Sequence, residues 1–217
     1  MRTAGWLSFV LALATLVLLI ALHVLSPEFD PSWRVVSEYA NGHYGWLLSL
    51  MFAAWALSSW TLAFALRADL RTLAGKIGWW FLLAAGASEA LAAAFDINNP
   101  VHGLADVLSL CLPVAAILIS VALSRIPSWS RAKTALLLTA NLSWISVVLL
   151  IVSLVAMFMS YTHAGGQIPA NGKSLPIGAT LPHGTIAVVG YANRLLVVVY
   201  NAWVMVAAWT IARRPAA

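Results

Sequence analysis

The stretch Trp6-Leu-Ser-Phe-Val-Leu-Ala-Leu-Ala-Thr-Leu-Val-Leu-Leu-Ile-Ala-Leu-His-Val-Leu25 decides the fold class of this chain. It contains no Asp, Glu, Lys or Arg, and an apolar helix of about 20 residues is long enough to cross the hydrocarbon core of a bilayer. The stretch is too long for the apolar part of a signal peptide, and Val24-Leu25-Ser26-Pro27 offers no cleavage site with small residues. We therefore interpret it as a membrane span.

Similar apolar stretches recur along the whole chain. The predicted spans are Trp6–Leu25, Trp46–Leu66, Ile77–Phe95, Leu104–Leu123, Thr134–Met159 and Ile186–Ala212. Of the 217 residues, 62% are hydrophobic and only 9% are charged, whereas soluble domains carry about a quarter charged residues. Because the chain lacks the polar surface that water requires, the composition predicts an all-α integral membrane protein, a single transmembrane domain built as a six-helix bundle.

The basic residues favour one orientation of this bundle. Those on one side of the membrane are Arg2, Arg67, Arg71, Lys76, Arg125, Arg131, Lys133, Arg213 and Arg214. The opposite connections contain only Arg34 and Lys173. Since positively charged loops stay in the cytoplasm, we expect both termini inside the cell. The net charge of +5 is dispersed over the ends of the spans, so we do not interpret it as a surface for nucleic acid.

The connections on the outer side differ in character. The first is expected to contain a short helix at the membrane interface, because Asp30-Pro31 is a favourable helix start and Asn41-Gly42 a favourable stop. The second, from Asp96 to His102, is predicted to be a tight hairpin. The third, from His163 to Gly184, is rich in Gly and Pro, and loops of that length are typical of functional covers or of mobile segments.

Helical spacing brings polar residues of three predicted spans together. Glu89 and Asp96 lie seven residues apart on one helical face, with Glu89 ~10 Å deeper in the membrane. His102 and Asp106 are four residues apart and share a face of the fourth span. An unpaired charge near the centre of a bilayer costs ~2.5–3.5 kcal/mol. We therefore expect Glu89, Asp106 and Arg194 to face one another, with Arg194 bridging one or both carboxylates.

Two interpretations of this charged cluster stay open. It could be a buried ion pair that only fixes the packing of the helices. It could instead be a binding or catalytic pocket, which is favoured by the second carboxylate and by the histidines at the same end of the bundle.

A metal site is a further hypothesis. Asp96, His102 and His183, with Glu38 as an additional ligand, could hold zinc, which accepts nitrogen and oxygen ligands. The chain has no His-Glu-x-x-His signature that would strengthen this hypothesis. Haem is not expected, because no two histidines occupy matching depths in the middle of different spans. The single cysteine, Cys111, excludes an intramolecular disulfide.

Three short motifs carry a family resemblance. They are Ser37-Glu-Tyr-Ala-Asn-Gly42 with Tyr44-Gly-Trp-Leu47, then Ala94-Phe-Asp96 with His102-Gly-Leu-Ala105, and last Gly190-Tyr-Ala-Asn-Arg-Leu195 with Trp203. They resemble the motifs of the domain-of-unknown-function 998 family, whose members are bacterial and archaeal multi-pass membrane proteins. The resemblance implies a six-span bundle in the prokaryotic inner membrane. It marks Glu38, Asp96, His102 and Arg194 as site residues, while Glu89 and Asp106 rest on spacing alone.

Three classes of function follow from these residues. The one we favour is an outward-facing polar pocket that binds or moves a lipid headgroup, an ion or a small solute. The second is a lipid hydrolase or transferase, with or without a metal, in which Asp96 and His102 activate water and Arg194 holds an anionic group. The third is a structural or accessory subunit whose polar cluster locks the helices. The lipid bilayer is the expected partner in each case.

Overall fold

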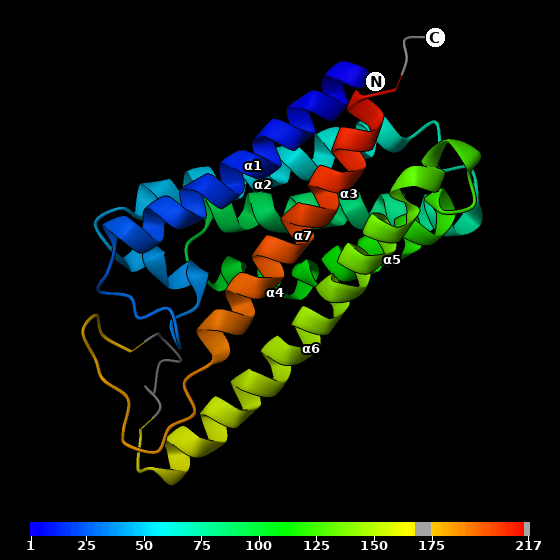
Figure 1. Ribbon diagram of the computed structural model, residues 1–217. Helices are drawn as coiled ribbons and strands as arrows, with labels where there is room; N and C mark the ends of the chain where they lie inside the picture. The colour runs from blue at the N-terminus through cyan, green and yellow to red at the C-terminus, as the bar shows by residue number, and fades with distance from the viewer. Residues whose placement is uncertain (168–174, 215–217) are drawn as a thin grey trace.

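The computed structural model describes residues 1–167 and 175–214 (Figure 1). Within that part, six helical segments are long and apolar enough to cross a membrane, as the sequence predicts. They are α1 (Arg2–Leu25), α2 (Gly45–Leu66), α3 (Leu73–Ala94), the pair α4 (Pro100–Ser109) and α5 (Cys111–Leu123), α6 (Lys133–His163) and α7 (Val189–Ala212). The described residues contain no strand, so the fold is all-α, and each predicted span overlaps one of these segments.

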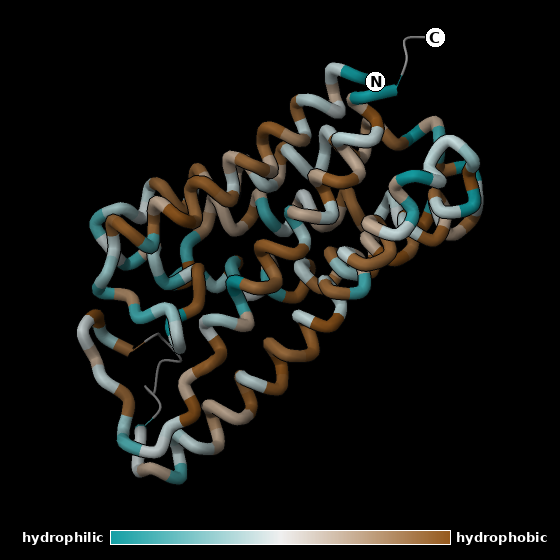
Figure 2. Tube along the Cα trace, viewed as in Figure 1, coloured by the Kyte–Doolittle hydropathy of each residue, from teal (hydrophilic) through white to brown (hydrophobic). Residues whose placement is uncertain are grey.

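The helices are arranged as a ring. α1 packs against α2 and α7, α3 joins α2 to α5, and α6 closes the ring between α5 and α7, while α4 packs against α3. The start of α1 and the end of α7 lie together at one end of the bundle, where Nε of Arg2 donates to the carbonyl oxygen of Ala212 over 3.3 Å (Figure 1). In Figure 2 the helices are largely hydrophobic along their length, and hydrophilic residues gather at the two ends. This pattern is that of a membrane-spanning bundle.

The two ends carry opposite kinds of charge. The end with the start of α1 and the end of α7, which we call the basic end, holds the connections that contain Arg67, Arg71, Lys76, Arg125, Arg131 and Lys133. There Arg214 forms a 2.6 Å salt bridge with Asp69, and Trp129 donates to the same carboxylate over 3.0 Å. These contacts join the α2–α3 connection, the α5–α6 connection and the end of α7. The other end, which we call the acidic end, carries Glu28, Asp30, Glu38 and Asp96.

Small residues allow α1 and α7 to pack closely. Gly5, Ser8, Ala12 and Thr15 are buried along one face of α1. A Cβ atom at Gly5 would lie 3.0 Å from the carbonyl oxygen of Ala208, so the two backbones approach each other directly there. Membrane helices associate through such small side chains because lipid provides no hydrophobic drive between them.

The fourth span is interrupted at Leu110, between α4 and α5. Pro113 explains the break, because its ring lacks an N–H and clashes with the carbonyl of the residue four positions earlier, Ser109. The span also begins earlier than the predicted Leu104. Asn99 caps α4 by accepting from the N–H of Val101 over 3.0 Å, and Pro100 occupies the first turn.

The first connection contains a short helix that starts later than predicted, and its position at the membrane interface stays a prediction. Asp30 accepts from the N–H of Ser32 and closes a turn, and a 3-10 helix, η1 (Val36–Asn41), follows that turn. The predicted stop at Asn41-Gly42 is correct. Trp33 and Val36 are buried, so the connection packs onto the acidic end of the bundle.

Candidate binding site

A pocket of about 360 Å³ opens in the half of the bundle next to the acidic end. Its wall is built by η1, α2, α3, α4, α5, α6 and α7. The polar side chains that line it are Ser37, Ser88, Glu89, His102, Asp106, Ser109 and Asn193, and its apolar side includes Phe52, Trp55, Val147, Leu150, Ile151 and Leu154. The pocket thus brings together Glu89, His102 and Asp106, three of the six predicted binding residues.

Glu89 is the most deeply placed acid of the pocket. It lies on α3 and is only 3% exposed. Ser59 of α2 donates to its Oε2 over 2.9 Å, and its Oε1 has no hydrogen-bond partner among the described residues. The indole nitrogen of Trp55 is also buried and unbonded within that part of the chain. Buried polar atoms without partners are rare in proteins, so Glu89 is an acceptor that a ligand donor can use.

His102 and Asp106 form the second polar group of the pocket. The imidazole of His102 is buried, and its Nδ1 lies 2.9 Å from the carbonyl oxygen of Phe95, to which it donates. Its Nε2 lies 3.8 Å from the carboxylate of Asp106. That distance is too long for a direct hydrogen bond. With Nδ1 donating, Nε2 of the neutral ring is an acceptor, so a single donor placed between Nε2 and the carboxylate would bind to both.

Asp106 is unusual for a residue of a membrane span because its side chain is 72% exposed. Its neighbours Leu104 and Val107 on α4, and Leu110 directly after this helix, are exposed apolar side chains. The carboxylate therefore lies at the rim of the pocket, beside a surface that is suited to lipid.

The predicted ion pair between Arg194 and the carboxylates of the pocket is wrong. Arg194 forms no salt bridge within the described residues. Its Nε donates to Nε2 of His23 over 2.6 Å, its Nη1 donates to the carbonyl of Arg34 over 2.6 Å, and its Nη2 donates to the hydroxyl of Tyr39 over 3.0 Å. The irregular backbone of the first connection supplies acceptors, so the guanidinium points toward α1 and this connection. Nothing in the sequence indicates that His23 and Tyr39 would be its partners.

Glu38 also lies outside the pocket, in an ion pair with a residue that the sequence analysis did not mark. Nη1 of Arg34 lies 2.5 Å from its carboxylate, and the Arg34 side chain is 2% exposed. Arg34 donates further to the carbonyls of Leu175 and Pro176, and it stacks on Trp33. It therefore ties the first connection to the one that precedes α7. The four-residue spacing of Arg34 and Glu38 is the signal that could have found this pair.

The predicted metal ligands do not form a cluster in the described part of the chain. In the part of the chain that the structure describes, no three His, Cys, Asp or Glu side chains lie close enough to hold a metal ion. Asp96 is exposed and accepts from the N–H of Asn98, so it closes the predicted hairpin, and His183 is exposed in the third connection. The separation arises because the imidazole of His102 is buried, whereas the side chains of Asp96 and His183 are exposed. Within the described residues, Asp96 and His102 are joined by no hydrogen bond or salt bridge.

The third connection is described only in part. Residues 168–174, which include Pro169, Gly172 and Lys173, lie outside the described residues, so the prediction of a cover falls partly on them. The described part reaches Arg34 through the carbonyls of Leu175 and Pro176.

Comparison with known proteins identifies the family of the chain and nothing more specific. A family model described as "Protein of unknown function (DUF998)" matches residues 8–210. No curated protein and no solved structure matches the chain.

Proposed function

For this chain, which belongs to the DUF998 family of proteins of unknown function, we propose that the pocket binds an amphiphile with a cationic, hydrogen-bond-donating head. One observation carries the proposal: two carboxylates and a histidine line the pocket, and no Lys or Arg side chain lines it within the described residues. Such a set of acceptors favours a primary ammonium group. It disfavours phosphate or carboxylate as the deepest group of the ligand, because like charges would then meet in a medium of low dielectric.

The apolar wall of the pocket supports an amphiphile over a small polar solute. Val147, Leu150, Ile151 and Leu154 present one side of α6 to the pocket, opposite the polar residues of α3 and α4. A ligand with an acyl chain would bury that chain on α6 and place its head at His102. An ammonium group beside Asp106 would also offset the cost of a carboxylate exposed in a membrane span.

The orientation of the protein belongs to the same proposal. Under it, the basic end and both termini lie in the cytoplasm of a prokaryotic cell, and the pocket opens toward the outer leaflet of the plasma membrane. The support is the concentration of basic residues in the connections of one end, which follows the rule that positive loops remain inside.

The test is the binding of dioleoyl phosphatidylethanolamine, compared with dioleoyl phosphatidylcholine, to the detergent-purified full-length protein by native mass spectrometry. The first lipid carries an ammonium with three N–H donors, and the second carries a quaternary cation with none. Hydrogen bonds to charged groups contribute about 1.5–3 kcal/mol each, so we expect Glu89→Gln or Asp106→Asn to weaken phosphatidylethanolamine binding about tenfold to a hundredfold.

Glu28→Gln is the matched control, because Glu28 is an exposed carboxylate at the same end and does not line the pocket. It should leave binding unchanged. The proposal fails if neither pocket variant weakens phosphatidylethanolamine binding, or if both variants weaken the two lipids equally.

A further inference from the structure

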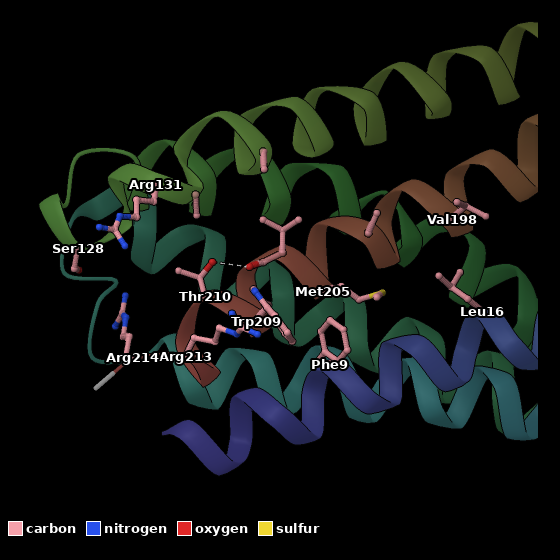
Figure 3. A pocket seen from close by; sticks show the side chains of 14 residues that line it. Phe9, Leu16, Ser128, Arg131, Val198, Met205, Trp209, Thr210, Arg213 and Arg214 are labelled. Atoms are coloured by element: carbon pink, nitrogen blue, oxygen red, sulfur yellow. Dashed lines mark hydrogen bonds between the residues drawn. The ribbon is translucent and has the colours of Figure 1, made fainter. Parts of the chain in front are cut away.

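A groove larger than the pocket described above lies at the basic end, and the two share no lining residue. It has a volume of about 920 Å³ and runs between α1, α6 and α7 (Figure 3). Its apolar lining includes Phe9, Leu16, Ala135, Val198, Met205 and Val206, and three arginines, Arg131, Arg213 and Arg214, line its outer end. The groove therefore combines a long apolar floor with a positively charged mouth.

The three arginines are not equivalent. Arg214 is neutralised by its salt bridge to Asp69 and lies against the ring of Trp129. Arg131 and Arg213 are exposed, and neither forms a salt bridge within the described residues. The mouth of the groove thus carries two positive charges that no carboxylate of the described chain offsets.

The wall beside Arg213 is an aromatic cluster. The guanidinium of Arg213 lies 4.0 Å from the centre of the Trp209 ring. Trp209 packs against Phe9 at 5.3 Å and against Trp6 at 5.4 Å between ring centres, so α1 and α7 hold the ring in place. Arg213 is therefore stacked on Trp209 at the mouth of the groove, and its guanidinium donates no hydrogen bond to the described residues.

The length of the groove matches a lipid chain. Of the lining residues, Val198 lies on α7 and Arg213 directly follows this helix, and their separation of 15 positions corresponds to about 22 Å along the helix axis. One leaflet contributes only about half of the ~30 Å hydrocarbon core. The floor of the groove thus extends from the headgroup level through a whole leaflet.

We propose that this groove binds an anionic phospholipid, with its acyl chain against α1, α6 and α7 and its phosphate at Arg131 and Arg213. The charge at the mouth is complementary to that phosphate, and arginine suits phosphate because its planar fork of donors matches the oxygen geometry. A soluble phosphate would use the mouth alone and leave the apolar floor without a role. The site does not depend on the proposed function, since it lies at the other end of the bundle and has the opposite charge.

The test compares dioleoyl phosphatidylglycerol, dioleoyl phosphatidylcholine and inorganic phosphate as ligands of the purified full-length protein in native mass spectrometry. The wild-type protein should bind phosphatidylglycerol in preference to phosphatidylcholine and should not retain inorganic phosphate. A basic residue near an anionic lipid surface changes affinity by about fivefold, so Arg131→Gln combined with Arg213→Gln should reduce the preference about 25-fold. Ala202→Trp, which fills the floor, should weaken both lipids.

Arg67→Gln combined with Arg125→Gln is the matched control. These arginines are exposed at the same end and do not line the groove, and their side chains form no hydrogen bond or salt bridge within the described residues. An equal loss in both double variants would overturn the proposal in favour of diffuse attraction by the basic end. So would retention of inorganic phosphate at the level of the lipid. A dimer mass that Ala202→Trp converts to monomer, without bound lipid, would assign the groove to a second copy of the chain instead.

Discussion

At the scale of the residue, the two buried arginines of the acidic end act as connectors. Arg194 joins α7 to His23 of α1 and to Tyr39 of η1, and Arg34 joins the first connection to the one before α7. Both satisfy their donors largely with neutral acceptors, which a membrane interior tolerates better than an unpaired charge. Neither arginine therefore pairs with Glu89 or Asp106, so no guanidinium neutralises the carboxylates of the pocket.

We expect Arg194→Met to lower the stability of the protein without altering the pocket chemistry directly. The substitution leaves the acceptors on His23, Arg34 and Tyr39 without their donor, at a cost of about 2 kcal/mol or more. In a thermal unfolding measurement of the purified protein, that corresponds to a fall in Tm of about 4–8 °C. Arg125→Met, at an exposed arginine of the basic end that lines neither the pocket nor the groove, is the control and should change the Tm little. Equal Tm values for the wild type and Arg194→Met would contradict the connector role.

At the scale of the element, the N-terminal turn of α7 is positioned by direct backbone contact. The N–H of Gly190 donates to the carbonyl of Ser32 over 2.9 Å. A Cβ atom at position 190 would collide with the carbonyl of Pro31 and would lie 2.6 Å from that of Arg34. Both obstacles are backbone atoms, so neither can rotate away. The absence of a side chain at Gly190 is what allows the first connection to rest on α7.

Gly190→Ala should therefore destabilise the protein and loosen the first connection, although alanine is the better helix former. We expect a lower Tm and faster proteolysis between residues 26 and 44 in limited digestion. Gly103→Ala is the matched control on α4, because a Cβ there would meet nothing within 4 Å. That change should raise stability by about 0.5–1 kcal/mol, as replacing glycine in a helix usually does. A Gly190→Ala variant as stable as Gly103→Ala would show that the contact is not needed.

At the scale of the whole molecule, the bundle presents a pocket and a groove whose charged lining residues have opposite signs. The pocket near the acidic end has carboxylates, and the groove at the basic end has arginines. If the basic end is cytoplasmic, each surface faces a different leaflet. Orientation is thus the property that determines which lipids each surface meets.

The orientation can be measured by labelling single cysteines. In a Cys111→Ser background, Thr180→Cys places a thiol in the exposed connection before α7, and Ser130→Cys places one in the exposed connection before α6. In intact spheroplasts of a bacterial expression host, a membrane-impermeant maleimide should label Thr180→Cys only. Ser130→Cys should react after the membrane is opened. The reverse pattern would place the pocket on the cytoplasmic side.

The sequence by itself determined the number of spans, their approximate limits and the polarity of the two ends. These features follow from apolar run length and from the placement of charge, which are local properties of the chain. The helical spacing of His102 and Asp106 was also sufficient to put both residues on one face, and they line one pocket with Glu89.

Only the tertiary structure decided which partner each polar residue meets. Spacing along one helix does not specify the neighbouring helix that a side chain faces. For this reason the predicted partners of Arg194 are wrong, and the ion pair of Arg34 with Glu38 is not among the predictions. The break at Leu110 and the backbone acceptors of the first connection are further examples. Their effects depend on how distant segments pack, because a buried donor is satisfied by whichever acceptor the fold brings within reach.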